Sequence, residues 1–172
     1  MFIREQIVFC KGTLEDDTLF QLTKAIERCS ITLTEKNLSL PVVVCITSPG
    51  GHLPSSYSFF EQRILFGPRD METIALDDTS SAALFLYILG AKRFVAPHTE
   101  FFFHKFSLHI NDYIQNIASA CERIHITPEH IMALMTEKGT NLTATDALAM
   151  GLAQEMLSAS DEKQLRLWRN NT

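Results

Sequence analysis

The stretch Val42-Val-Val-Cys-Ile-Thr-Ser-Pro-Gly-Gly51 decides the fold of this chain. Its first half is apolar and β-branched, which is typical of a buried strand. Two adjacent glycines at the end of a strand leave backbone N–H groups that no Cβ covers, so a substrate carbonyl can come close to them. A turn of this kind can form an oxyanion site. It can equally be a plain tight turn, because Pro-Gly and Gly-Gly are common turn signals.

Strand and helix patterns alternate on both sides of this stretch. The sequence predicts strands at 6–10, 42–46, 72–76, 93–95 and 101–104. It predicts helices at 16–29, 57–66, 81–89, 112–124, 128–135, 143–150 and 161–168. Thr143-Ala-Thr-Asp146 resembles a capping box, and Gly151 suits the position after a helix end. The alternation predicts an α/β architecture with a largely parallel sheet flanked by helices, in one domain of residues 1–172 with a C-terminal tail at 157–172.

Composition narrows the class of protein. The chain has 172 residues, of which 46% are apolar and 20% charged, as in an ordinary globular domain. Its net charge of -5 and its lack of clustered Lys and Arg argue against a nucleic-acid partner. The apolar run at 82–91 is too short to cross a bilayer, and the first residues carry charge too early for a signal peptide. We therefore expect a mature, soluble, cytoplasmic protein without a membrane partner.

Cysteine and histidine spacing gives no sign of a metal or cofactor. Cys10, Cys29, Cys45 and Cys121 show no Cys-x-x-Cys spacing. Buried, reduced thiols are the expected state, as in a reducing compartment. The six histidines do not repeat at metal-ligand spacing either. We expect no cofactor.

Two further segments could carry chemistry. Thr79-Ser-Ser-Ala82 lies between a strand and an apolar helix, where free N–H groups favour a developing negative charge. These hydroxyls can equally be N-caps of that helix. His104 ends the segment Glu100-Phe-Phe-Phe-His104, where an imidazole can act as a general base or as a hydrogen-bonded structural residue. Together with the glycine turn, they supply oxyanion donors, a nucleophile and a base at strand ends.

These segments resemble the proteolytic subunit of the Clp protease (ClpP), within the wider ClpP/crotonase fold. Ser48-Pro-Gly-Gly51 is similar to that family's Ser-Pro-Gly-Gly turn. The likeness continues through Phe85-Leu86 and Gly90-Ala-Lys92 to Arg93-Phe94 and Pro97. It ends with Thr143-Ala144, Ala147 and Gly151-Leu152, and it covers residues from about 6 to 156.

The resemblance implies a role for each candidate residue. Ser81 would be the nucleophile and His104 the base, and the N–H groups of Gly51 and Ala82 would form the oxyanion hole. It also implies a serine endopeptidase that hydrolyses peptides or unfolded proteins. The family assembles as a homo-oligomeric ring and works with a Clp-type ATPase.

The chain departs from the family at several positions. Gly139 stands where the family has the triad Asp, and Asp77-Asp78 stand where it usually has Gly-Gln. The carboxylates at 77–78 could oppose negative charge near Ser81, or they could stabilise a helix N-terminus. Ala83 replaces a glycine. The segment 105–142 is shorter than the corresponding region of the family, which forms the handle that joins two rings. The first predicted strand lies close to residue 1, so we expect no N-terminal axial loops of the family's kind. A double ring and the ATPase partnership are therefore open.

Three other functions remain compatible with the sequence. A catalytically weak or inactive ring subunit would keep the fold without turnover, as Gly139 and Asp77-Asp78 suggest. A crotonase-like acyl-CoA enzyme would share the glycine turn, although the chain has no basic cluster for the CoA phosphates. A Ser/Lys peptidase would use Lys105 or Lys92 as its base.

Overall fold

The computed structural model describes residues 2–66, 71–105, 121–122 and 124–171. Its strands are β1 (Ile7–Lys11), β2 (Val43–Ser48), β3 (Glu72–Ser80), β4 (Arg93–Val95), β5 (Glu100–Phe103), β6 (Thr140–Thr143) and β7 (Glu155–Met156). Its helices are a 3-10 turn, η1 (Arg4–Gln6), followed by α1 (Asp16–Glu35), α2 (Leu53–Phe66), α3 (Ala83–Ile88), α5 (Pro128–Leu134), α6 (Ala144–Ala149) and α7 (Ala159–Asn170).

The described strands form one mostly parallel sheet, as predicted. The strand order is β1-β2-β3-β4-β7, and neighbours along this path are parallel. Strand β5 pairs in parallel with the end of β3 and antiparallel with β6. The sheet therefore divides at β3, whose first half lies beside β4 and whose last residues lie beside β5.

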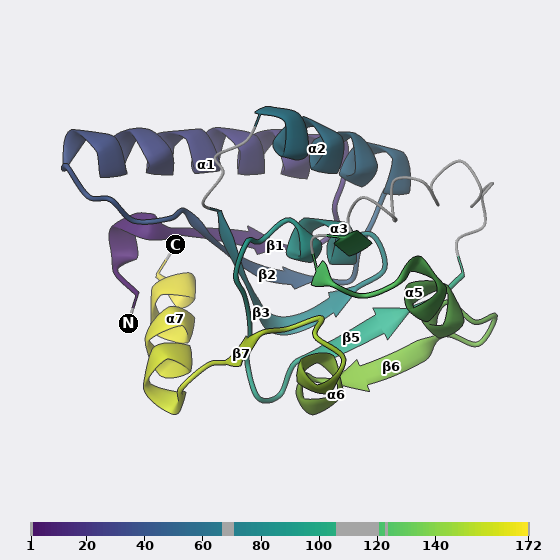
Figure 1. Cartoon of the computed structure of the whole chain (residues 1–172). Helices are drawn as coiled ribbons and strands as arrows, with labels where there is room; N and C mark the ends of the chain where they lie inside the picture. Colours follow the sequence, from purple (N-terminus) through teal and green to yellow (C-terminus); the bar gives the residue numbers. More distant parts are fainter. Residues whose placement is uncertain (1, 67–70, 106–120, 123, 172) are drawn as a thin grey trace.

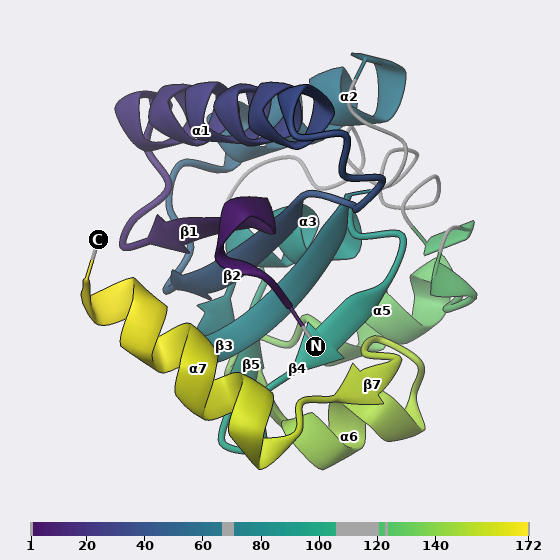
Figure 2. The same ribbon diagram turned by 90° about the vertical axis from the view of Figure 1, so that its left-hand side faces the viewer.

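Helices cover both faces of the sheet. Helices α1 and α2 form an outer layer on one face, with α3 between them and the strands, and α7 lies on the other face (Figures 1 and 2). Alternation along β2 explains the two layers, since successive side chains of a strand point to opposite faces. Val44 and Ile46 pack in the core under α1 and α3, whereas Val43 and Cys45 pack in the core that Leu165 of α7 joins.

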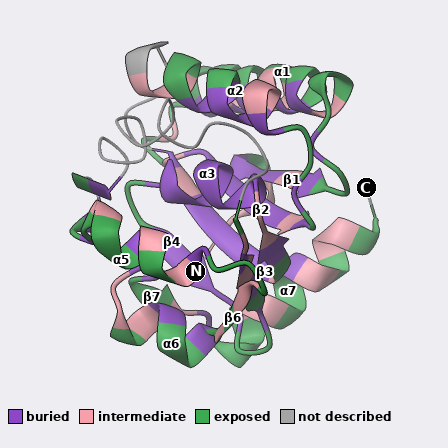
Figure 3. Ribbon diagram, turned by 90° about the vertical axis from the view of Figure 1, so that its right-hand side faces the viewer, coloured by how far each residue is buried: buried purple, intermediate pink, exposed green. Residues whose placement is uncertain are grey.

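Burial follows these layers. In Figure 3 the central strands and α3 are buried, while the outer surfaces of α1 and α2 are exposed. Every side chain of α3 is buried, as its almost entirely apolar sequence Ala-Leu-Phe-Leu-Tyr-Ile requires. Buried Arg93 ties β4 to the end of α6, because its guanidinium donates to the carbonyls of Gly90, Gly151 and Leu152.

Most predicted elements are present with shifted ends. The strand at 93–95 has the predicted bounds, and α1 runs six residues past its predicted end at 29 because Leu33 continues the buried stripe. The capping box of α6 is confirmed: Thr143 Oγ1 accepts from Asp146 N at 3.2 Å, and Asp146 Oδ2 accepts from Thr143 N at 2.9 Å.

Two strands were missed by the sequence pattern. Strand β6 is mostly polar and only partly buried, so its antiparallel pairing with β5 leaves no apolar alternation to read. Strand β7 has only two residues. Most of the predicted helix at 112–124, and with it much of the segment compared with the family's handle, lies outside the described residues.

Candidate active site

Ser81 lies in a sharp turn between β3 and α3. Its φ is +53°, a left-handed conformation that costs a non-glycine residue about 1–2 kcal/mol. The Ser81 N–H donates to Phe102 O of β5 at 2.9 Å, which holds this turn against the strand that leads to His104. Strained residues of this kind cluster at functional sites.

The predicted capping role of Thr79, Ser80 and Ser81 is wrong. Thr79 and Ser80 belong to β3, and the residue that precedes α3 is Ala82, which forms no side-chain cap. Pairing of β3 with β5 outweighs the local preference of hydroxyl residues for a helix N-terminus, because it satisfies the backbone of this segment.

The Ser81 hydroxyl and the His104 imidazole are hydrogen-bonded. Ser81 Oγ lies 2.8 Å from His104 Nε2, although 23 residues separate them in sequence. His104 Nδ1 lies 2.9 Å from the backbone carbonyl of Lys105. A carbonyl can only accept, so Nδ1 carries the proton of this bond and Nε2 offers its lone pair to the Ser81 hydroxyl.

The glycine turn after β2 lies directly against Ser81. A Cβ on Gly50 would stand 2.7 Å from Ser81 Cβ and 3.0 Å from Ala82 N, and Gly50 has a φ of +99°. On the other side of the turn, Leu14 N donates to Gly50 O and His52 N donates to Leu14 O, both at 2.8 Å. Gly51 therefore lies between two anchored peptide groups. Within the described residues, neither the Gly51 N–H nor the Ala82 N–H donates to a protein acceptor.

Gly139, at the position that the resemblance assigns to the triad Asp, lies in a tight turn after α5. Its N–H donates to Thr136 O at 3.1 Å, and its φ is +76°. A Cβ there would collide with the Phe102 ring, which lies 5.7 Å from the His104 ring, centroid to centroid. An aromatic ring therefore fills the space beside His104 on this side.

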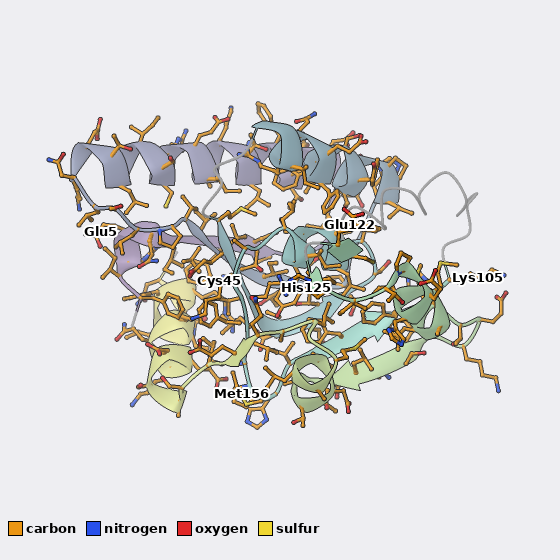
Figure 4. All side chains as sticks on the ribbon, viewed as in Figure 1. Glu5, Cys45, Lys105, Glu122, His125 and Met156 are labelled. Carbon is orange, nitrogen blue, oxygen red and sulfur yellow. The ribbon has the colours of Figure 1, made fainter. Side chains whose placement is uncertain are left out.

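Both candidate lysines form salt bridges at the surface. The Lys105 ammonium pairs with Glu137, and Lys92 Nζ lies 2.7 Å from Glu155. Figure 4 shows Lys105 at the edge of the molecule and Cys45 within its body. The described contact of the Ser81 hydroxyl is with His104, so the geometry favours histidine over lysine as its base.

The predicted alternative that Asp77 stabilises the N-terminus of a helix is wrong, because its carboxylate pairs with α7 instead. Its Oδ1 accepts from Arg166 Nη1 at 2.7 Å, and its Oδ2 pairs with Arg169, both from α7. Burial alone would raise the pKa of Asp77, but the hydrogen bonds from Arg169 and Arg166 outweigh it and lower the pKa. Sequence reasoning missed both arginines, because only folding brings α7 beside β3.

Other chemistry finds little support among the described residues. No three His, Cys, Asp or Glu side chains gather there as a metal would need. All four cysteines are buried and unpaired, and burial raises the pKa of the Cys10 thiol to about 12 and that of Cys121 to about 11. Neutral thiols are poor nucleophiles. No described helix has the length and apolarity to span a membrane.

The fold and this arrangement define an α/β protein with a serine–histidine pair at strand ends. A similar solved structure is a point mutant of ClpP1 from Listeria monocytogenes, with a TM-score of 0.70 and 19% sequence identity. The match covers 92% of this chain and 94% of that chain, and it shows a shared fold. A family model described as Clp protease matches residues 1–160, so the chain belongs to the Clp protease family.

Proposed function

We propose that this protein is a serine peptidase of the Clp type, in which Ser81 is the nucleophile and His104 the general base. The observation that carries the proposal is the 2.8 Å hydrogen bond between Ser81 Oγ and His104 Nε2. This distance is within the reach that a nucleophile and its base require. Membership of the Clp protease family supports peptide bonds as the substrate.

In the proposed mechanism, Ser81 Oγ attacks the scissile carbonyl carbon as His104 Nε2 takes the hydroxyl proton. The protonated imidazole then gives this proton to the leaving amine, which leaves an acyl-enzyme. Water, deprotonated by the same nitrogen, attacks the ester and releases the second product. Throughout, the Nδ1–H bond to the Lys105 carbonyl holds the imidazole ring in one orientation.

The N–H groups of Gly51 and Ala82 are the proposed oxyanion donors. Both belong to turns that meet at Ser81, and neither donates to a protein acceptor in the described part of the chain. The bridge to Leu14 fixes the Gly51 turn before substrate arrives, so little reorganisation is needed in the transition state. Removing one such donor typically slows the reaction by about 10²–10³-fold.

The Lys105 carbonyl would take over part of the role of the triad carboxylate. Loss of the correct imidazole tautomer costs about 10⁴-fold in a serine protease triad. A carbonyl acceptor at Nδ1 keeps the correct tautomer but contributes no full negative charge against the imidazolium. We therefore expect an active peptidase that is slower than one whose His104 faces a carboxylate at position 139.

The family also supports the proposed assembly, a homo-oligomeric ring that takes peptides or unfolded proteins. A Clp-type ATPase as its partner remains part of this proposal. Light scattering coupled to size-exclusion chromatography would measure the mass of the assembly. A mass of 19.4 kDa at all concentrations would contradict the ring.

A fluorophosphonate probe tests the nucleophile. We expect it to label the wild-type protein at Ser81, located by mass spectrometry of the labelled peptide. The variant Ser81→Ala should lose the label, and His104→Gln should slow labelling by about 10²-fold or more. Ser80→Ala is the matched control, since it removes the neighbouring hydroxyl and should be labelled like the wild type.

A fluorogenic peptide assay then distinguishes the serine peptidase from the inactive ring subunit. Turnover that disappears in Ser81→Ala supports the peptidase. Labelling at Ser81 without peptide turnover would indicate a competent nucleophile with an unsuitable peptide, and an unfolded protein such as fluorescein-labelled casein would be tried next. Absence of Ser81 labelling in the wild type would refute the peptidase and favour the inactive ring subunit, which Gly139 also suggests.

A further inference from the structure

Strand β3 contains a bulge immediately before the candidate active site. Its pairing with β2 runs in register from Val43↔Glu72 to Ile46↔Ala75 and resumes at Ser48↔Thr79. Residues 76–78 of β3 thus stand opposite the single residue Thr47. A bulge of this kind bends a strand and redirects the residues that follow it.

The bulge is also where β3 changes its other neighbour. Before it, residues Thr73 to Ala75 pair with β4, and after it Thr79 and Ser80 pair with Phe101 and Phe102 of β5. Strand β5 leads into His104, and β3 leads into Ser81. Ser81 and His104 therefore follow the two strands that pair with each other only after the bulge.

Side chains from α7 hold the bulge in place. Arg166 Nη2 donates to the carbonyl of Leu76 at 2.9 Å, and Arg166 Nη1 donates to Asp77 Oδ1 at 2.7 Å. The Arg169 guanidinium pairs with Asp77 and also donates to Thr47 Oγ1, the residue opposite the bulge, at 3.3 Å. Figure 2 shows α7 lying along the sheet next to β3.

The side chains that make these contacts are partly buried, and further hydrogen bonds from α7 and from β3 support them. Side chains of Arg166, Arg169 and Asp77 are 30%, 18% and 34% exposed. Glu162 Oε1 accepts from Arg166 Nε at 2.9 Å, which orients its guanidinium on the helix. Thr79 Oγ1 donates to Asp77 O at 3.3 Å and closes the bulge toward Ser81. An arginine fork that grips both a carboxylate and a backbone carbonyl restrains geometry more than a single ion pair does.

We propose that Arg166 and Arg169 of α7 are positioning residues for the Ser81–His104 pair, acting through the bulge at residues 76–78 that they clamp. The effect on catalysis rests on the proposed peptidase function, whereas the contacts between α7 and the bulge do not depend on it. The family model ends at residue 160, so the clamp joins Asp77, which lies within the matched residues, to two arginines beyond them.

Hydrogen exchange tests the clamp without reference to activity. In Arg166→Gln and Arg169→Gln, we expect the amides of Ser81 and its β5 partners to exchange at least about 10-fold faster than in the wild type. Exchange in the β2–β3 pairing ahead of the bulge, such as Val44 and Ile74, should stay unchanged. Lys163→Gln is the matched control, because it removes an exposed cation from the same helix.

Labelling by the fluorophosphonate probe tests the catalytic consequence. A misplacement of about 1 Å can cost about 10²-fold in rate, so we expect Ser81 labelling to slow by about 10- to 100-fold in Arg166→Gln. Arg166→Lys keeps the charge but loses the fork to Leu76 O, and it should recover only part of the rate. A change limited to the free energy of unfolding would leave the labelling rate of the folded protein at the wild-type value in both variants.

The outcomes distinguish this inference from the proposed function. Faster exchange at Ser81 together with slower labelling supports the clamp and its role. Unchanged exchange at Ser81 in both arginine variants overturns the clamp, whatever the activity. A wild-type protein that the probe does not label refutes the proposed function and the catalytic meaning of the clamp, while hydrogen exchange still decides whether α7 holds the bulge.

Discussion

The turn at Gly51 should not tolerate even one methyl group. In Gly51→Ala, the new Cβ would overlap the backbone of Leu14, standing 2.5 Å from Leu14 N and 2.8 Å from Leu14 C. Backbone atoms cannot rotate away as a side chain can. The turn and the segment at Leu14, which is 0% exposed, must therefore separate.

Separation breaks the two hydrogen bonds of this bridge, Leu14 N to Gly50 O and His52 N to Leu14 O. Each bond contributes about 0.5–1.5 kcal/mol, and a buried group left without its partner costs about 1–3 kcal/mol. We therefore expect Gly51→Ala to lower the free energy of unfolding by about 2–5 kcal/mol. This is a large share of the roughly 5–15 kcal/mol that stabilises a typical domain.

Gly12→Ala provides the matched control. Gly12 has a φ of +80°, but a Cβ there meets nothing within 4 Å. Gly12→Ala should therefore lower the free energy of unfolding only by the strain of a left-handed backbone, about 1–2 kcal/mol. Urea unfolding of both variants at one protein concentration measures the difference. A loss below about 1 kcal/mol for Gly51→Ala, or one no larger than for Gly12→Ala, would refute the packing argument.

Two further predictions concern the departures from the family. Gly139→Asp should not restore a triad, because the new Cβ would collide with the Phe102 ring and the backbone at this position has a left-handed φ of +76°. We expect this variant to have a lower free energy of unfolding and no faster labelling of Ser81. A faster labelling rate would contradict this prediction. Asp77→Asn tests the lowered pKa of Asp77, because a carboxyl whose pKa is lowered by folding stabilises the protein above its unfolded pKa. The difference in unfolding free energy between wild type and variant should be constant near neutral pH and shrink as the pH falls below about 4; a difference independent of pH would count against the ion pairs.

Patterns within short stretches of sequence predicted most helices and strands, because the periodicity of apolar residues and the capping residues depend only on neighbours in the chain. The apolar, β-branched run of β2 and the buried stripe of α1 follow directly from strand and helix periodicity. The capping box at Thr143 needs only residues three apart. Strand β6 was not predicted, because its mostly polar residues form a strand only through pairing with β5, which is distant in the sequence.

The candidate site could be predicted in composition but not in geometry. Resemblance singled out Gly51, Ser81, Ala82 and His104, which lie on three separate segments of the chain. Their spacing carries no information on whether Ser81 Oγ reaches His104 Nε2, since this depends on the bulge in β3 and on its change of partner from β4 to β5. The capping interpretation of Ser81 failed for the same reason.

The amino-acid sequence by itself determined the α/β class, the family and the residue types that a serine peptidase needs. These properties depend on short-range periodicity and on motifs that are contiguous in the chain. Only the tertiary structure decided which acceptor orients His104 and what Asp77 does. The Lys105 carbonyl and the two arginines of α7 act through contacts of specific geometry, and those of α7 span about ninety residues of sequence. Such contacts leave no periodic signal, because they exist only once the sheet has closed and α7 has packed against it.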